Sequence, residues 1–304
     1  MENPNPSVED GIWPWSTFFV FLLLAILLGG MLGSLLVYLL STAYGVSLSI
    51  VLENLESGAT AADRNFVRSV LLIRHLTSFA LPALVTAYFF YRKRWITGLK
   101  LNLAPAGKDV VWGTLFIVVA FPLSQAALWL NKQIPLPAWA REMEASAAGL
   151  TENLLRMESP GELVFTLLVI AVIPAIGEEL VYRGLLQNKL MERLNPHVAI
   201  WVAALIFSAF HLQLEGLLPR MLLGAILGYA FYWTQNLWVP IIAHFFLNGI
   251  QVIVPYFYKD AIEQMSSQPP QEINWWGILF SAMLTFGVGY TLMKGSQTHE
   301  GRAD

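Results

Sequence analysis

The sequence predicts an all-α fold: a polytopic membrane helix bundle with about eight transmembrane helices. Of its 304 residues, 56% are apolar and only 13% are charged, whereas a soluble domain carries about 25% charged residues. Several apolar runs also reach the roughly 20 residues that a helix needs to cross a bilayer. The net charge of −3 gives no reason to expect a nucleic-acid partner, and the absence of cysteine excludes thiol catalysis and thiolate metal sites.

The N-terminal region, residues 1–160, is expected to hold three membrane helices and their loops. The first apolar run is too long for a cleaved signal peptide. In the second run, Arg74 and His75 are expected in the first turns, at the membrane interface. The three predicted spans are residues 13–40, 67–91 and 110–130.

The next region, residues 161–255, is expected to hold four spans, and residues 256–304 a last span followed by a polar tail. The fourth span starts at Leu163 and continues as an amphipathic extension until Asn195-Pro196 breaks it. The polar segment 259–274 separates the seventh span from the eighth. The remaining predicted spans are residues 198–212, 217–233, 237–254 and 275–293.

Basic residues between the spans predict the orientation. The densest basic cluster, residues 92–94, follows the second span directly. If both termini are cytoplasmic, ten lysines and arginines fall on the cytoplasmic side and seven on the other. Because cytoplasmic loops are enriched in lysine and arginine, we predict a multi-pass protein of the cell membrane with both termini in the cytoplasm.

Two adjacent carboxylates, Glu178 and Glu179, follow the long apolar run of the fourth span. Charges at a helix end can simply mark the membrane surface. A helix would also place Glu179 and Arg183 on one face with the acid N-terminal, which favours an ion pair. Glu178 would point about 100° away and gain no such partner. One carboxylate would then be structural and the other free.

Polar side chains inside the later spans are few. His211 ends the sequence Phe207-Ser-Ala-Phe-His, and His244 begins the sequence His-Phe-Phe-Leu-Asn248. The four-residue spacing places His244 and Asn248 on one helix face. A single membrane histidine is usually a packing residue, but two of them near a glutamate pair indicate a shared polar site.

The break at Asn195-Pro196 predicts that Glu178 and His211 lie at the same depth. The break falls midway between these two residues in the sequence. In a helical hairpin, residues equidistant from the turn lie at similar height, because both arms rise about 1.5 Å per residue. We therefore expect Glu178 to be level with His211 in the membrane.

Three spaced motifs occur in order in consecutive predicted spans: Glu178-Glu179-x-x-x-Arg183, Phe207-x-x-x-His211 and His244-x-x-x-Asn248. Together they resemble the three motifs of the CPBP intramembrane protease family. That family includes the type II CAAX prenyl endopeptidases and bacterial relatives linked to bacteriocin processing or self-immunity. The resemblance covers roughly residues 162–254, and the flanking spans carry no family-specific signal.

The resemblance implies an eight-helix membrane fold that hydrolyses peptide bonds at a site open to the cytosol. Its expected substrate is a membrane-embedded or lipid-anchored protein or peptide. By the family's motifs, Glu178 would be the general base, and His211 would hold or help activate the water. His244 and Asn248 would donate hydrogen bonds to the oxyanion. The pair of Glu179 with Arg183 would be structural.

A zinc site is the alternative mechanism. His211 and His244 with either Glu178 or Glu179 could hold Zn²⁺ with one open position. The sequence lacks His-Glu-x-x-His, however, and the two glutamates are expected to point apart. We therefore favour a metal-free site without a cofactor, with zinc as the alternative.

Two other classes of function remain as alternatives. A bacteriocin-immunity or scaffold protein could keep this fold without proteolysis, but it need not keep all four of Glu178, His211, His244 and Asn248. A transporter could use the same polar cluster as a proton relay. The sequence shows no paired broken helices and no inverted repeat, which are typical of secondary transporters.

Overall fold

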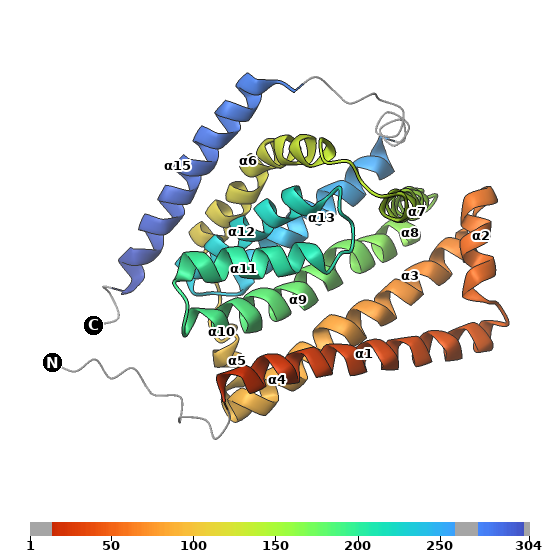
Figure 1. The fold of residues 1–304 in the computed structure, drawn as a ribbon, viewed down its shortest axis with the longest axis horizontal. Helices are drawn as coiled ribbons and strands as arrows, with labels where there is room; N and C mark the ends of the chain where they lie inside the picture. Colours follow the sequence, from red (N-terminus) through yellow and green to blue (C-terminus); the bar gives the residue numbers. More distant parts are fainter. Residues whose placement is uncertain (1–13, 259–272, 301–304) are drawn as a thin grey trace.

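The computed structural model describes residues 14–258 and 273–300, and these residues form a bundle of α-helices without a strand (Figure 1). Most of the polar segment expected over 259–274, the polar N-terminus and the last residues of the tail lie outside this part of the chain. The all-α prediction is confirmed. The start of the first helix and the end of the last one lie at the same end of the bundle (Figure 1).

One side of the bundle is formed by α1 and a second, nearly continuous helix (Figure 1). Gly29 and Gly33 of α1 are buried against this second helix, where added methyl groups would collide with Thr77. Small residues let two helix backbones approach closely in this way. The elements are α1 (Trp15–Tyr44), α3 (Ala61–His75), the π-helical segment η1 (Leu76–Ala80) and α4 (Leu81–Tyr91).

The centre of the bundle is a nearly continuous helix that carries the glutamate pair, packed against a helical hairpin and α13. Its elements are α8 (Pro160–Thr166), η3 (Leu167–Val172), α9 (Ile173–Glu179), η4 (Leu180–Gln187) and α10 (Asn188–Met191). The hairpin is α11 (Pro196–Ala209) and α12 (Leu217–Thr234), and α13 is Trp238–Phe257. The opposite side is formed by α6 (Gly107–Lys132) and α15 (Trp275–Glu300) (Figure 1).

Six of the described helices are long and apolar enough to cross a membrane, so this is a multi-pass membrane protein. They begin at Trp15, Ala61, Gly107, Pro160, Trp238 and Trp275. The expected eight spans also included α11 and α12. With 14 residues, α11 is about 21 Å long and falls short of the roughly 30 Å hydrocarbon core. One face of α11 packs on α12 and η4, while Val198, Trp201 and Leu205 on another face are exposed.

The second membrane helix begins earlier than the hydrophobic pattern indicates. Thr60 accepts from the backbone N–H of Asp63, and the Asp63 carboxylate accepts from the backbone N–H of Thr60. This capping box satisfies N–H groups of the first turn and starts the helix at Ala61. His75 therefore lies about 21 Å into the helix. The expectation that His75 sits in the first turns of this helix is wrong.

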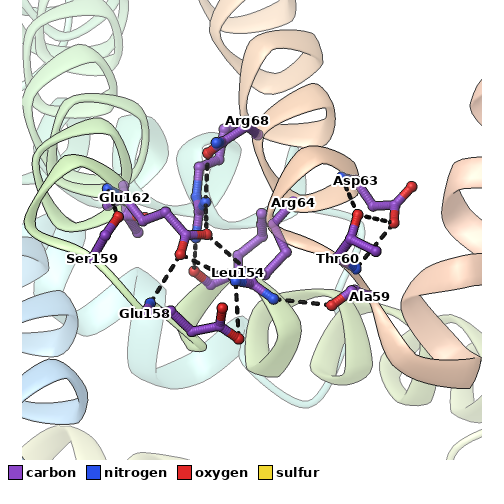
Figure 2. Close-up of polar contacts among 11 residues, drawn as sticks. Ala59, Thr60, Asp63, Arg64, Arg68, Leu154, Glu158, Ser159 and Glu162 are labelled. Carbon is purple, nitrogen blue, oxygen red and sulfur yellow. Dashed lines mark hydrogen bonds and ion pairs between the residues drawn. The ribbon is translucent and has the colours of Figure 1, made fainter.

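A buried ionic cluster joins α3 to α8 (Figure 2). Both carboxylate oxygens of Glu162 accept from Arg64, at 2.9 and 3.1 Å, and one also accepts from Arg68 at 2.8 Å. Arg68 donates further to the Leu154 carbonyl, and the backbone N–H of Glu158 donates to Glu162. The three charged side chains are at most 4% exposed. We call Arg64, Arg68 and Glu162 the α3–α8 cluster.

Three π-helical segments interrupt the helices of the central region. Segment η1 directly follows His75, and η4 directly follows Glu179. At their ends, N–H groups bond five residues back: Leu81 to Leu76, and Asn188 to Arg183. Such wider turns in helices often lie at functional sites. Here two of them begin beside the glutamate pair and its neighbour His75.

Candidate active site

Glu178 and Glu179 lie inside the protein, at the end of α9. Glu178 is 5% exposed and Glu179 is fully buried. Reading the pair as a charged helix end at the membrane surface is therefore wrong. Burying an ionised carboxylate costs several kcal/mol unless the charge is paired and hydrogen-bonded. The partners of each carboxylate therefore determine what the site can do.

The ion pair expected between Glu179 and Arg183 is present. Glu179 Oε1 accepts from Arg183 Nη1 at 2.6 Å, and Arg183 Nη2 donates to the Gly224 carbonyl of α12 at 2.7 Å. The same Glu179 oxygen accepts from Nδ1 of His244 at 2.8 Å. Glu179 Oε2 has no hydrogen-bond partner within the described chain. Glu179 thus joins α9 to α13, and Arg183 joins the π segment after α9 to α12.

Glu178 is not left without a partner, contrary to the expectation. Its Oε1 accepts from Nε2 of His75 at 3.0 Å. Its Oε2 lies 3.9 Å from Nε2 of His244, beyond hydrogen-bond distance but close enough for a charge interaction. The two glutamates do leave α9 in different directions. His244 nevertheless reaches both of them, one with each ring nitrogen.

Sequence reasoning missed His75 as a site residue. The resemblance pointed only to spans four, five and seven, and His75 precedes Glu178 by 103 residues. The available signal was a histidine inside an apolar helix, which marks a functional position in a membrane protein. Because the hydrophobic pattern predicts a helix start at residue 67 and not at Ala61, it assigns His75 to the first turns and not to the helix interior.

His211 lies just beyond the end of α11 and close enough to Glu178 to interact electrostatically. Its Nδ1–H donates to the Phe207 carbonyl at 2.9 Å. Because the carbonyl can only accept, the neutral imidazole carries its proton on Nδ1 and leaves Nε2 as an acceptor. The chain reversal expected from the Asn195-Pro196 break is present, and Asn195 caps the start of α11.

The Phe207 ring packs against three of the polar side chains. The His211 ring lies edge-on to it, with centroids 5.0 Å apart, and the His244 ring lies 6.3 Å away at 88°. On another side, the Arg183 guanidinium lies over this ring, 5.0 Å from its centroid. A cation over an aromatic face is stabilised by the ring quadrupole. Phe207 therefore sets the spacing between both histidines and the buried ion pair.

Asn248 lies one turn after His244 on α13. Its Nδ2 donates to the Ile170 carbonyl of η3 at 3.2 Å. Since η3 is π-helical, its carbonyls are not all taken by the regular helical pattern, and a side-chain donor can satisfy one of them. The amide nitrogen carries two hydrogens, so one N–H remains for another acceptor.

The described side chains do not group as zinc ligands. Zinc needs ligand atoms converging within about 2.0–2.3 Å of one ion. Nε2 of His75 is engaged by a carboxylate, whereas His244 and His211 are bonded through Nδ1 and keep Nε2 open. Among the residues that the structure describes, no three histidine or acidic side chains are arranged to hold a metal ion. We therefore route no step through a metal.

Comparison with protein families identifies the same part of the chain. The family model described as "Type II CAAX prenyl endopeptidase Rce1-like" matches residues 160–250. The match includes Glu178, Glu179, His211, His244 and Asn248. It leaves out residues 1–159, and with them His75 and the two arginines of the α3–α8 cluster.

The alignments with similar proteins cover only part of this chain and part of each relative. YpbD of Bacillus subtilis, whose printed name calls it uncharacterized, is 28% identical over 44% of this chain and 66% of its own. YdiL of Bacillus subtilis, named as a membrane peptidase, is 29% identical over 34% of this chain. The membrane-embedded CAAX protease MroQ of Staphylococcus aureus is 28% identical over 33% of this chain.

The chain spans 42% of the length of each of these last two relatives. No solved structure gives a significant match. The matches and the motifs agree on one segment, the central helix with the α11–α12 hairpin and α13, which also encloses the buried glutamate pair. Residues 160–250 of this multi-pass membrane protein are therefore similar to the CPBP family of membrane proteases.

Proposed function

We propose that this protein is an intramembrane endopeptidase that hydrolyses peptide bonds with Glu178 as the general base. One observation carries the proposal: Glu178 is buried beside two imidazoles, one oxygen is fixed by His75, and the other faces His244 without a direct bond. A carboxylate held in this way has one oxygen available for a water molecule. The match to CAAX endopeptidases and the name of MroQ support the reaction class.

In this mechanism, Glu178 and His211 activate the attacking water. Glu178 Oε2 takes a proton from a water molecule as the water oxygen attacks the substrate carbonyl carbon. The free Nε2 of His211 accepts the second hydrogen bond of the water and orients its lone pair toward the carbonyl. Collapse of the tetrahedral intermediate breaks the C–N bond, and Glu178 returns the proton to the leaving amine. One water is consumed for each new carboxylate and amine.

His244 and Asn248 stabilise the oxyanion of the tetrahedral intermediate. Since Nδ1 of His244 donates to Glu179, Nε2 carries a proton only in the imidazolium form, and the Glu179 carboxylate stabilises that form. The protonated Nε2 and the second N–H of Asn248 can then donate to the developing oxyanion. Glu179 with Arg183 holds His244 in place and does not touch the substrate.

The expected substrate is a membrane-embedded or lipid-anchored protein or peptide that reaches the site from the bilayer. We also propose that both termini are cytoplasmic and that the protein resides in the cell membrane. In this orientation α13 enters from the cytoplasmic side, and His244 lies six residues after its first residue, Trp238. The scissile bond would then be cut in the cytoplasmic half of the membrane.

A scaffold or immunity protein without proteolysis is the second candidate, because the family includes such relatives. Quantitative proteomics of membranes from cells with the wild type or Glu178→Ala distinguishes the two. We expect an uncleaved precursor to accumulate in the Glu178→Ala cells, with equal amounts of the two proteases in the membrane. If the membrane proteomes are identical and the cells with Glu178→Ala behave like the wild type, the non-proteolytic scaffold or immunity function would be favoured.

A further inference from the structure

We propose that His75 is a positioning residue of the active site, which donates a hydrogen bond to Glu178 Oε1 and so leaves Oε2 for the attacking water. This inference rests on the proposed function and extends it. His75 lies on α3, outside the segment that matches the family model. The N-terminal half of the chain would thus supply a functional group and not only a support.

The geometry gives His75 a defined role at one oxygen. Its Nε2 lies 3.0 Å from Glu178 Oε1, a hydrogen-bond distance, whereas Nε2 of His244 lies 3.9 Å from the other oxygen, Oε2. A carboxylate can only accept, so Nε2 of His75 is the donor. The donated bond fixes the rotation of the carboxylate about its last side-chain bond. Oε2 therefore keeps one position relative to His244.

Packing holds the His75 ring in this position. The ring stacks on Phe79, with centroids 4.9 Å apart and planes at 24°. Phe79 belongs to η1, the π segment that starts directly after His75. On the facing helix, a methyl group at Gly177 would lie 3.2 Å from Phe79 and 3.4 Å from the Ala80 nitrogen. The glycine beside Glu178 therefore permits the approach that brings His75 into reach.

His75 is more exposed than Glu178 and His244. Its side chain is 24% exposed, compared with 7% for Glu178 and 6% for His244. The carboxylate is therefore restrained by a ring that is itself only partly enclosed.

Carbodiimide labelling tests this contact without a substrate. N,N′-dicyclohexylcarbodiimide adds to protonated carboxyl groups in apolar surroundings, and peptide mass spectrometry counts the adduct on Glu178. Loss of the donor disfavours the ionised carboxylate. In membranes at pH 7 we expect His75→Leu to label Glu178 about tenfold faster than wild type. His75→Gln, which keeps an N–H donor, should stay within about threefold of the wild-type rate.

Controls separate this effect from a general loosening of the fold. His197 lies exposed in the first turn of α11, and its Nδ1 bonds the Tyr229 hydroxyl and not a carboxylate. His197→Leu should leave Glu178 labelling unchanged. Glu178→Gln defines the background of the assay. A His75→Leu rate equal to wild type would overturn the proposed contact.

Steady-state cleavage of a membrane-peptide library tests the catalytic consequence. We expect His75→Leu to lower kcat about 10-fold to 100-fold with KM nearly unchanged, and His75→Gln to recover most of kcat. An equal loss in both variants, or wild-type kcat in His75→Leu, would overturn the positioning role. Cleavage by Glu178→Gln at the wild-type rate would instead overturn the proposed function. The carbodiimide labelling would still show whether His75 donates a hydrogen bond to Glu178.

Discussion

Two buried ionic clusters link the helix of α3 to the central helix, and their bonding differs. In the α3–α8 cluster, both oxygens of Glu162 are taken by Arg64, one also by Arg68, and the other also by a backbone N–H (Figure 2). In the active-site cluster, Glu178 Oε2 has only a 3.9 Å contact to His244, and Glu179 Oε2 has no hydrogen-bond partner within the described chain.

We interpret this difference as the one between a structural ion cluster and the proposed catalytic site. Charges saturated by arginine hold helices together but have little capacity for a further ligand. Histidines and an incompletely bonded carboxylate can accept and return protons near neutral pH. Glu162 would therefore govern stability and Glu178 activity, although both are nearly equally buried, at 4% and 5% exposure.

The largest expected effect is on activity at the proposed catalytic site. Glu178→Gln keeps the shape and most hydrogen-bonding atoms but cannot take a proton from water. We expect cleavage to fall about 10²–10⁴-fold, the usual cost of losing a general base. Thermal unfolding in detergent should change little. Turnover of a membrane peptide at the wild-type rate would refute the assignment of Glu178.

The next largest effect is on stability at the α3–α8 cluster. Glu162→Gln leaves Arg64 and Arg68 buried with less than their balancing charge, and breaking a buried ion pair from one side costs roughly 3–5 kcal/mol. Thermal unfolding in detergent should report this loss. Glu152→Gln is the matched control, because Glu152 pairs with an Arg156 that is 61% exposed. Such a pair contributes about 1 kcal/mol or less, so equal melting of both variants would contradict the comparison.

A third expected effect distinguishes the proposed site from a zinc site. Removing one oxyanion donor by Asn248→Ala should lower kcat about 10²–10³-fold. With zinc, Asn248→Ala could be mild, while His244→Ala would remove the metal. Elemental analysis of purified protein checks this directly. Stoichiometric zinc that is lost in His211→Ala and His244→Ala, with activity of the chelated enzyme restored by zinc, would overturn the metal-free proposal.

The smallest expected effect is the stability recovered when both partners of the ion pair that holds His244 are replaced. Glu179→Leu strands Arg183 and should cost stability, whereas Glu179→Leu combined with Arg183→Leu should recover part of it, because apolar residues can replace a buried pair. Activity should not recover, since His244 loses its Nδ1 acceptor in both variants. A double variant that is less stable than Glu179→Leu would show that Arg183 stabilises the protein through other contacts.

The sequence was sufficient to predict the membrane helix bundle and the contact of Glu179 with Arg183. Both follow from local rules: apolar length for the helices and the four-residue spacing for the pair. The three motifs also identified the central helix and α13 as the functional segment. The turn at Asn195-Pro196 reverses the chain between Glu178 and His211. Because such a break is a local signal, it could be predicted from the sequence.

Other contacts could not be predicted because they depend on long-range packing. Arg64 and Glu162 are 98 residues apart, and His75 and Glu178 are 103 apart. From the sequence, Arg64 and Arg68 are predicted only to be among the seven basic residues on the non-cytoplasmic side. The π-helical segments also have no periodic signal, yet they change which side chains face each other. The capping box at Thr60 was visible in the sequence and would have placed His75 correctly.

The most direct test of the central claim measures activity per folded molecule in Glu178→Gln and Glu162→Gln side by side. Purified wild type and both variants are incubated with a membrane-peptide library below their melting temperatures, and new peptide termini are counted by mass spectrometry. The folded fraction of each sample is measured at the same time. We predict that folded Glu162→Gln cleaves within about threefold of wild type, whereas folded Glu178→Gln loses at least about 100-fold. Equal losses per folded molecule in the two variants would contradict the division between a stabilising and a catalytic cluster.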